Sequence, residues 1–339
     1  MIVLSGDIGG TNTRLQLTEY KDNNITSLFS KKYKGAKFNS LAEILTLFTN
    51  ESNVCKGNIQ SACIAVAGPV ISGEVKLTNL PWFVTEYEIQ KTLDIKYVKL
   101  INDFESIGYG IETLNKNDIY TLQKGNFSNT SPIAYIGAGT GIGTGIVTYK
   151  DNHTIVIPTE GGHVDFAPVG DEQTQLLNFL RKKLRRVSLE RVCCGTGMVN
   201  IYKYLINDPQ SIYNESPEMR LAMFNSEDKA ATISQFAFTY KNPLALKVID
   251  IFIKVYGSSA GNLALSTLPR KGLYVVGGIA PKMINQLNDG RFIDMFLDKG
   301  RMSKMLSEIP VHICLNTDVG LKGAESYAYK MITGFSDHL

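Results

Sequence analysis

The order strand, glycine-rich turn, strand occurs twice in this chain and constrains its fold more than any other feature. The apolar run at 2–8 ends at the turn 9–12, and an alternating strand resumes at 13–20. The same order returns around the glycine loop 137–143. Alternation with a period of two on both sides of a glycine turn is typical of a β-hairpin. Two such hairpins in distant parts of the chain predict a duplicated two-domain architecture rather than a single Rossmann sheet.

Strands alternate with helices over the rest of the chain, which favours an α/β fold. Ser40 is expected to cap one helix, and Thr85 with Glu88 forms a capping box at the start of another. The segment 207–227, which contains Pro209 and Pro217, is predicted to be a loop or an insertion. The predicted helices are 41–49, 85–93, 171–186, 195–206, 228–239, 243–268 and 320–332, and further strands are predicted at 62–67, 97–101, 133–136, 144–149, 272–276 and 310–315.

Charge and length exclude some classes of function. The net charge is only +3 in 339 residues, so the whole chain gives no argument for binding nucleic acid or an anionic membrane. The length suggests two domains. The basic run 181–186 is interpreted as the solvated end of an amphipathic helix rather than as a nucleic-acid patch.

The cysteine pattern and the N-terminus predict a soluble protein in the reduced cytoplasm. The chain has five cysteines, no pair with CxxC spacing and no basic N-terminal signal region. The uncharged stretch 125–149 contains six glycines and Pro132, which argues against a membrane helix. In 244–268, charged residues interrupt the apolar run.

The glycine loops do not match the common nucleotide motifs. There is no Gly-Lys pair, which excludes a Walker A loop, and no register of 137–145 gives GxGxxG. The remaining possibility is a pair of hairpin tips whose backbone N–H groups, with Thr11, Asn12 and Thr140, bind phosphate. Asp7 beside phosphates would need a cation, so it is expected to hold Mg²⁺ directly or through water. The alternative is that both turns are glycine-rich for backbone reasons alone.

Polar residues at strand ends and turns supply candidates for chemistry. Asp103 follows a strand and opens a helix, where it could act as a general base or could be a simple N-cap. In Glu160-Gly161-Gly162-His163, the two glycines would aim a carboxylate and an imidazole at one volume, suited to sugar hydroxyls. The alternatives for His163 are a metal site or a structural role. Glu190 is a further carboxylate candidate, and the Gly277-Gly278 turn could face an adenine ring or simply join a strand to a helix.

With these residues laid out, the sequence closely resembles the bacterial-type glucokinase family of the hexokinase–actin-like ATPase superfamily. The resemblance covers nearly the whole chain. Its motifs are GDIGGTN at 6–12, LINDF at 100–104, GAGTGIG at 137–143, EGGHVDFAP at 160–168 and GGIAP at 277–281. Three positions depart from the family pattern without removing a chemical role: the long segment 207–227, Gly68-Pro69 and Leu189. Cys193-Cys194-Gly195 also lacks the spacing of the zinc motif found in related repressor/ORF/kinase-type sugar kinases.

The resemblance implies an ATP- and Mg²⁺-dependent kinase that phosphorylates D-glucose at O6, the entry step of glycolysis. Asp103 would be the catalytic base, and the sugar would contact Asn102, Asp103, Glu160, His163 and Glu190. The implied positions of the Mg-nucleotide site are Gly6, Asp7, Ile8, Gly9, Gly10, Thr11, Asn12, Gly139, Thr140, Gly141, Gly277 and Gly278. Asp7 would hold the metal, with water between them.

The resemblance also implies a ribonuclease H-like, actin-like ATPase fold of two α/β domains that close on a sugar in the cleft between them. The smaller domain would comprise 1–113 plus 320–339 and the larger one 114–319. A homodimer is implied as well. Two other hypotheses stay open: a kinase of another hexose or amino sugar, and an ATP-binding scaffold or sugar-responsive regulator without kinase activity. The sequence does not indicate strictness for glucose, regulation, other phosphoryl donors or a role for 207–227.

Overall fold

The computed structural model describes residues 1–9, 11–22, 24–77, 79–151, 153–209 and 211–334. The chain divides into two compact units. Unit 1 comprises Met1–Asn117, Val147–Pro158 and the residues from Asn316 onward, and unit 2 comprises Asp118–Ile146 and Thr159–Leu315. Among the described residues, no helix is both long enough and apolar enough to span a membrane.

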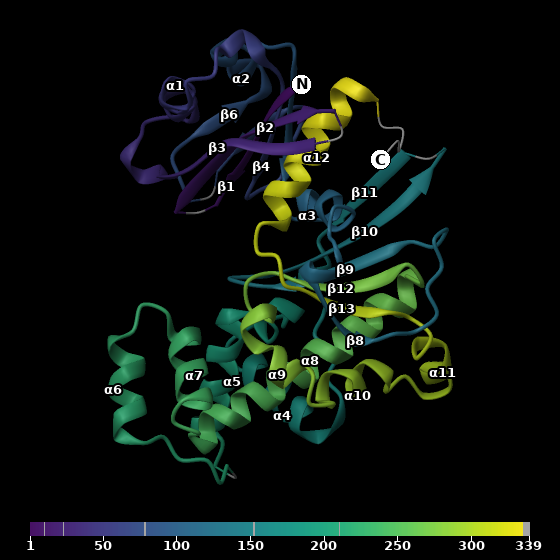
Figure 1. The fold of residues 1–339 in the computed structure, drawn as a ribbon. Helices are drawn as coiled ribbons and strands as arrows, with labels where there is room; N and C mark the ends of the chain where they lie inside the picture. Colours follow the sequence, from purple (N-terminus) through teal and green to yellow (C-terminus); the bar gives the residue numbers. More distant parts are fainter. Residues whose placement is uncertain (10, 23, 78, 152, 210, 335–339) are drawn as a thin grey trace. The chain divides into compact units, whose positions relative to one another are not determined.

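Unit 1 contains a five-stranded sheet with the order β3-β2-β1-β4-β7 (Figure 1). The strands are β1 (Ile2–Ile8), β2 (Asn12–Lys21), β3 (Asn24–Lys34), β4 (Ile59–Val66) and β7 (Tyr97–Asn102). The pair β1–β2 is antiparallel, which confirms the first predicted hairpin, whereas β4 is parallel to both β1 and β7. Ile8 pairs with Val66, and Val66 pairs with Asn102. The ends of β1 and β7 therefore lie at one edge of the sheet.

Three of the four α-helices that the structure describes in unit 1, α1, α2 and α3, begin at a residue whose side chain caps them. The four are α1 (Leu41–Ser52), α2 (Glu86–Leu93), α3 (Asp103–Ile111) and α12 (Val319–Thr333), and a small hairpin of β5 (Glu74–Lys76) and β6 (Phe83–Thr85) completes the unit. The hydroxyls of Ser40 and Thr85 accept hydrogen bonds from the backbone N–H groups of Glu43 and Glu88, as expected of N-caps.

The main sheet of unit 2 has the order β11-β10-β9-β12-β13-β8. Its strands are β8 (Ile119–Gln123), β9 (Ile133–Ala138), β10 (Ile142–Lys150), β11 (His153–Thr159), β12 (Gly272–Val276) and β13 (Val311–Cys314). Strand β12 is parallel to β9 and β13. The segment Val147–Pro158 of β10 and β11 groups with unit 1, whereas the predicted division placed it in the large domain. Within unit 1, Thr154 donates to Glu112 and accepts from Lys330, which anchors this segment.

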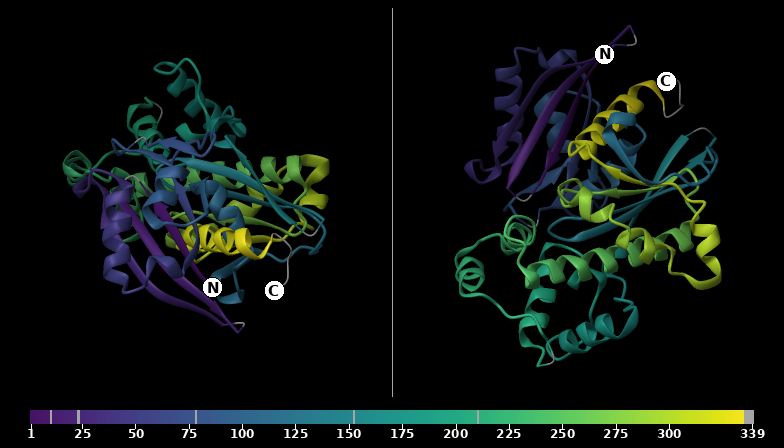
Figure 2. Two further views of the ribbon diagram at one scale, coloured as in Figure 1. Left: turned by 90° about the horizontal axis from the view of Figure 1, so that it is seen from above. Right: turned by 60° about the horizontal axis from the view of Figure 1, so that its bottom comes forward.

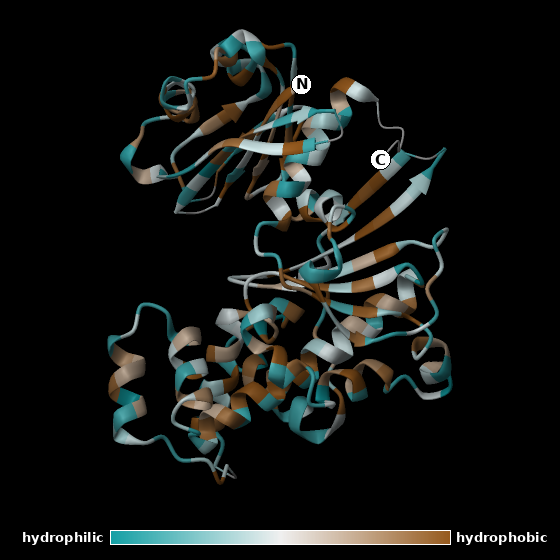
Figure 3. Ribbon diagram, viewed as in Figure 1, coloured by the Kyte–Doolittle hydropathy of each residue, from teal (hydrophilic) through white to brown (hydrophobic). Residues whose placement is uncertain are grey.

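Helices pack below this sheet, and α8 contributes more buried hydrophobic residues to the core of unit 2 than any other helix. They are α4 (Gly170–Arg181), α5 (Gly195–Asn207), α6 (Pro217–Asn225), α7 (Lys229–Phe238), α8 (Pro243–Thr267), α9 (Ile284–Leu287), α10 (Arg291–Leu297) and α11 (Ser303–Leu306). Helix α8 runs along the sheet (Figures 1 and 2) and is rich in hydrophobic residues (Figure 3). The Tyr256 hydroxyl on α8 donates to the Ile136 carbonyl and accepts from the Ala138 N–H, so it joins the helix to β9.

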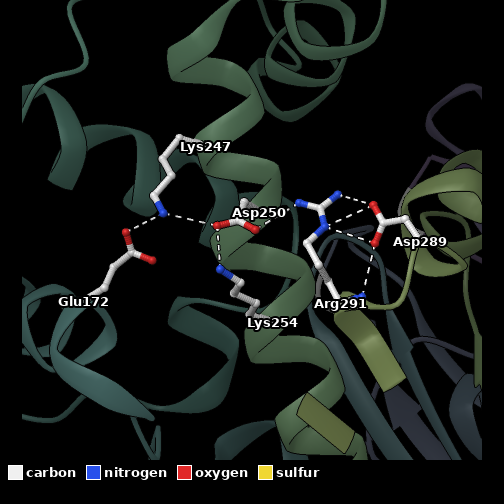
Figure 4. Close-up of polar contacts among 6 residues, drawn as sticks. All are labelled: Glu172, Lys247, Asp250, Lys254, Asp289 and Arg291. Carbon is white, nitrogen blue, oxygen red and sulfur yellow. Dashed lines mark hydrogen bonds and ion pairs between the residues drawn. The ribbon is translucent and has the colours of Figure 1, made fainter. Parts of the chain in front are cut away.

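A network of charged side chains also ties α8 to its neighbours (Figure 4). Asp250 accepts from Lys254 at 2.9 Å, from Arg291 at 3.0 Å and from Lys247 at 3.2 Å. Lys247 lies 2.6 Å from the Glu172 carboxylate on α4, and Arg291 on α10 also pairs with Asp289. Burial opposes the ionised form of Asp250, but its hydrogen bonds to these cations outweigh burial and lower its pKa. The network thus holds three helices around one carboxylate.

Three sequence predictions about local structure were wrong. The segment 207–227 contains α6, because the Ser216 hydroxyl caps the helix at Met219 and Pro217 occupies its first turn. Helix α4 ends at Arg181, so only the first residue of the basic run 181–186 is helical and the other five follow the helix. The second glycine loop is shorter than predicted, because β9 and β10 extend into it and leave only residues 139–141.

Candidate functional site: an acidic sheet edge in unit 1 and a cavity in unit 2

Two carboxylates, Asp103 and Asp318, act by their charges on a third, Asp7, at the edge of the unit 1 sheet. Asp7 lies near the end of β1, Asp103 begins α3, and Asp318 immediately precedes α12. Burial is the main cause that raises the pKa of Asp7 to about 6, and the charges of Asp103 and Asp318 raise it further. Arg14 and Lys32 act in the opposite direction. The edge therefore concentrates negative charge where parallel strands end, a common ligand-binding position in α/β sheets.

Asn102, not Asp103, is the N-cap of α3. The Asn102 carbonyl oxygen Oδ1 accepts from the N–H groups of Phe104 at 2.8 Å and Glu105 at 3.3 Å. Its Nδ2 donates to the Gly68 carbonyl at 3.1 Å. The simple-cap alternative for Asp103 is therefore wrong, although Asp103 Oδ1 accepts from the Phe104 N–H at 2.9 Å. The Asn102 Oδ1 atom is engaged by the helix, so for a ligand Asn102 has the second hydrogen of its Nδ2 group, the one that does not bind Gly68.

The first glycine turn joins β1 to β2, and its residues differ in what they expose. The Gly9 N–H donates to the Asn12 carbonyl at 3.0 Å, and Thr11 is exposed. Ile8 is 1% exposed, so its side chain belongs to the core and only its backbone could reach a ligand. Gly6 lies within the sheet, where a Cβ would meet the Leu15 side chain at 2.9 Å. Gly10 lies outside the described residues.

Two glycine turns of unit 2 pack against each other. The Gly139 N–H donates to the Gly141 carbonyl at 2.8 Å, and the Gly139 carbonyl accepts from the Gly195 N–H at 2.9 Å. Gly277 has a φ of +88°, and a Cβ there would lie 2.8 Å from the Ala138 carbonyl oxygen. Only glycine allows that backbone conformation at so close an approach.

A cavity of about 930 Å³ opens beside these turns. Gly139 and Thr140 line it, together with Ile279, Lys282 and Met283 from the segment after Gly278. The cavity has the size of a small-molecule site. Neither Gly277 nor Gly278 lines it; these glycines place the neighbouring residues instead.

The cavity walls favour an anionic ligand. The first residues of α5 (Gly195 and Thr196) and of α7 (Lys229 to Ala231) line the cavity, and the N-terminus of a helix carries positive potential. Four basic residues line the cavity, namely Arg191, Lys203, Lys229 and Lys282. Two acidic residues, Glu227 and Asp228, line it as well, and the Asp228 carboxylate caps α7 by accepting from the Ala231 N–H. These residues were not predicted from the sequence because they come from four separate segments without a shared motif.

The Glu160–His163 turn has the geometry that its two glycines suggested. His163 Nε2 lies 3.8 Å from Glu160 Oε2, and the two side chains are 61% and 86% exposed. A Cβ on Gly161 or Gly162 would lie 2.0 Å from an oxygen of β10, so both glycines are required for packing. His163 is therefore not a buried structural histidine. Among the described residues, no cluster of three metal-ligating side chains forms there or elsewhere.

Glu190 lies against the second glycine loop. It sits half-buried in a short 3-10 turn, and its Oε2 is 3.4 Å from the Ile142 N–H. A Cβ on Gly141 would lie 2.5 Å from the same oxygen. The Leu189 N–H donates to the Val164 carbonyl, which links this turn to the segment after His163. The residues predicted in unit 2 thus lie on connected turns, whereas Asp7, Asn102 and Asp103 belong to unit 1.

Comparison with known proteins identifies the family. The chain matches the family described as Glucokinase over residues 4–331. It belongs to the glucokinase family. A curated glucokinase from Nostoc sp. is 41% identical over 343 residues, which cover 97% of this chain and 99% of the relative. The resemblance stated from the sequence motifs is therefore confirmed.

Solved glucokinase structures have the same fold. The glucokinase of an Antarctic psychrotroph superposes with a TM-score of 0.84 at 31% identity and covers 97% of this chain and 99% of its own. A ROK family glucokinase from Streptomyces griseus, solved with glucose and AMPPNP, gives a TM-score of 0.64 at 18% identity, covering 97% and 100% of the two chains. At that identity the second likeness concerns the fold alone.

Proposed function

We propose that this chain transfers the γ-phosphoryl group of ATP to O6 of D-glucose. Membership of the glucokinase family supports the reaction class. The observation that carries the proposal is the position of Asp103 at the N-terminus of α3, where its charge acts on Asp7. Asp7 lies on β1, in the hairpin that is proposed to bind phosphate. A carboxylate at the N-terminus of α3 can accept a hydroxyl proton close to where a phosphate would be bound.

The cavity in unit 2 is the proposed nucleotide site. Gly139, Thr140 and Gly141 would contact phosphates, and the turn Gly277-Gly278 would position the wall that receives the adenosine. The two helix N-termini and the lysines that line the cavity support a polyphosphate ligand. The related structure from Streptomyces griseus contains AMPPNP, an analogue of ATP. In unit 1, Gly6 to Asn12 would supply the second set of phosphate contacts.

Asp7 fits the role of a Mg²⁺ residue. Its raised pKa reports a buried carboxylate that neighbouring carboxylates repel, and a divalent cation would relieve this repulsion. Mg²⁺ commonly binds one or two carboxylates together with waters and substrate phosphates, so a dedicated cage of ligands is not needed. When bound, the ion would neutralise phosphate charge.

Asp103 is the proposed catalytic base. It would accept the proton of the glucose 6-hydroxyl as that oxygen attacks the γ-phosphorus, and no covalent enzyme intermediate is needed. Backbone N–H groups of the glycine turns would stabilise charge on the transferring group. Asn102, Glu160, His163 and Glu190 would hold the sugar through hydrogen bonds to its hydroxyls. The same related structure was solved with glucose bound.

The proposal includes a cellular and structural setting. We place the enzyme in the cytoplasm, at the entry of glycolysis, as a homodimer with the two-domain actin-like ATPase fold. The domains would be 1–113 plus 320–339 and 114–319. Five cysteines without a disulfide among the described residues are compatible with a reducing compartment.

ADP release from Mg-ATP tests the proposal when it is measured with glucose, mannose, fructose, N-acetylglucosamine and no sugar. Turnover that depends on glucose supports it. Turnover with another sugar alone would keep the mechanism but change the substrate. Folded protein that binds ATP yet turns over no sugar would favour the regulator hypothesis and overturn the proposed function.

A further inference from the structure

Strand β2 and helix α12 meet through a row of polar side chains. Arg14, Gln16 and Tyr20 are spaced by even numbers on β2, so they share one face of the strand. Arg14 donates to Asp318, and both Gln16 and Tyr20 donate to the carboxylate of Glu325, at 2.8 and 3.0 Å. Glu325 is 9% exposed, so these bonds lie largely inside unit 1. The row fixes where α12 begins relative to β2.

Asp318 occupies the N-cap position of α12 but does not cap it. An aspartate at this position normally accepts from a backbone N–H of the first turn. The Asp318 side chain makes no such bond, and its Oδ1 instead accepts from Arg14 Nη1 at 2.5 Å. The Asp318 N–H in turn donates to the Asn316 side chain at 2.9 Å, which holds the residue at the entry of the helix.

Arg14 is directly opposite Asp7 in the antiparallel pair of β1 and β2, so the two side chains share one face of the sheet. The charges of Asp103 and Asp318 also act on Asp7, and Lys32 is the other base that does so. A guanidinium binds a carboxylate strongly and often through two hydrogen bonds. Without a fixed partner, Arg14 would pair with Asp7, a carboxylate that the proposed reaction requires.

We propose that Asp318 is a positioning residue that holds Arg14 away from Asp7 and so keeps this carboxylate available to the Mg-nucleotide. The inference rests on the proposed function, since it concerns the same site. It assigns to the start of α12 a task in phosphoryl transfer, although Asp318 contacts neither reactant. Its effect is expected to pass mainly through Arg14, whose charge acts on Asp7 more strongly than the charge of Asp318 does.

A double-mutant cycle tests this dependence. The proteins are wild type, Asp318→Asn, Arg14→Gln and the double variant, with steady-state turnover measured at varied glucose and Mg-ATP. In the wild-type background, Asp318→Asn should lower kcat about tenfold while the KM for glucose changes less than about twofold. In the Arg14→Gln background, the same change should cost less than about twofold, because the residue through which it acts is gone.

Two further variants separate positioning from structure. Asp318→Glu keeps the carboxylate and should recover at least about a third of wild-type kcat. Asp94→Asn removes one negative charge from an exposed turn of unit 1 and should leave kcat unchanged. Thermal unfolding of Asp318→Asn should stay within a few degrees of wild type. Equal losses of kcat in both Arg14 backgrounds, or no loss in either, would overturn the proposal.

Binding of Mg-ADP to the same four proteins of the cycle, measured by calorimetry, distinguishes this inference from the proposed function. If wild type turned over no sugar, the proposed function would fail. The coupling between Asp318→Asn and Arg14→Gln could still be measured as a change in affinity for Mg-ADP. Coupling between the two substitutions in that affinity supports the role of Asp318. Strictly additive effects on affinity contradict it.

Discussion

Gly323 on α12 lies directly against Ser106 on α3. A Cβ at Gly323 would be 1.7 Å from the Ser106 carbonyl oxygen, and a Cβ at Gly110 would be 1.9 Å from the Val319 carbonyl oxygen. The two helices therefore cross at a distance that only glycine permits. This crossing joins the helix that carries Asp103 to the helix that follows Asp318.

Gly323→Ala should lower the stability of unit 1 by about 3 kcal/mol, since the backbones must separate to admit the methyl group. Turnover should fall as well, because α3 would shift with Asp103. Gly320→Ala is the matched control on the same helix: its Cβ would meet no backbone atom, only the Ser106 hydroxyl at 3.3 Å and the Ile107 side chain at 3.8 Å. Denaturant unfolding of both variants gives the comparison. If Gly323→Ala and Gly320→Ala had equal free energies of unfolding, α3 and α12 would be able to move apart without cost, which contradicts the prediction.

Asp103→Asn should reduce turnover by roughly a hundredfold or more, because an amide cannot accept the hydroxyl proton. Glucose binding should persist, since the amide keeps an acceptor oxygen at the start of α3. Turnover and equilibrium binding of glucose should be measured on the same preparation. Near-normal turnover would remove Asp103 as the base.

Asp7→Asn should stabilise the protein free of nucleotide at pH 7.5. The pKa of Asp7 is raised to about 6 in the fold from 3.8, so the folded state loses stability as the pH rises from about 4 through 6. Removing this charge should raise stability on the order of 2 kcal/mol at pH 7.5, with little difference near pH 4. Melting temperatures across this range, with Asp94→Asn as the charge control, provide the test. A difference that does not vary with pH contradicts the assignment.

Asp250→Asn should destabilise unit 2, because Lys247, Lys254 and Arg291 would lose their shared carboxylate (Figure 4). A loss of about 2 kcal/mol is expected at neutral pH. The pKa of Asp250 is lowered in the fold, so its contribution is present above pH 3.8 and disappears as the pH falls through its folded value. The gap to wild type should therefore close in acid. Asp289→Asn, which leaves Asp250 in place, should cost less in denaturant unfolding at pH 7.

The sequence predicted those features that local pattern determines. The hairpin that carries Asp7, the capped helix α2 and the strand that ends at Asn102 all follow from alternation and capping residues. Strand β3 was missed because nearly all of its residues are exposed, which leaves little contrast between its two faces. The hydrogen bond between Arg14 and Asp318 joins residues 304 positions apart, and no sequence motif contains both, so their contact could not be predicted. The cavity wall was missed for the same reason: folding, not spacing, gathers its cations.

The position of the phosphate on the product tests the central claim most directly. Proton-coupled phosphorus NMR of the product from glucose and Mg-ATP distinguishes the possible acceptor oxygens. Phosphate on O6 should appear as a triplet, because two protons on C6 couple to phosphorus. A doublet would place the phosphate on a ring carbon bearing one proton, and that result, or the absence of any sugar phosphate, would contradict the proposed transfer to O6.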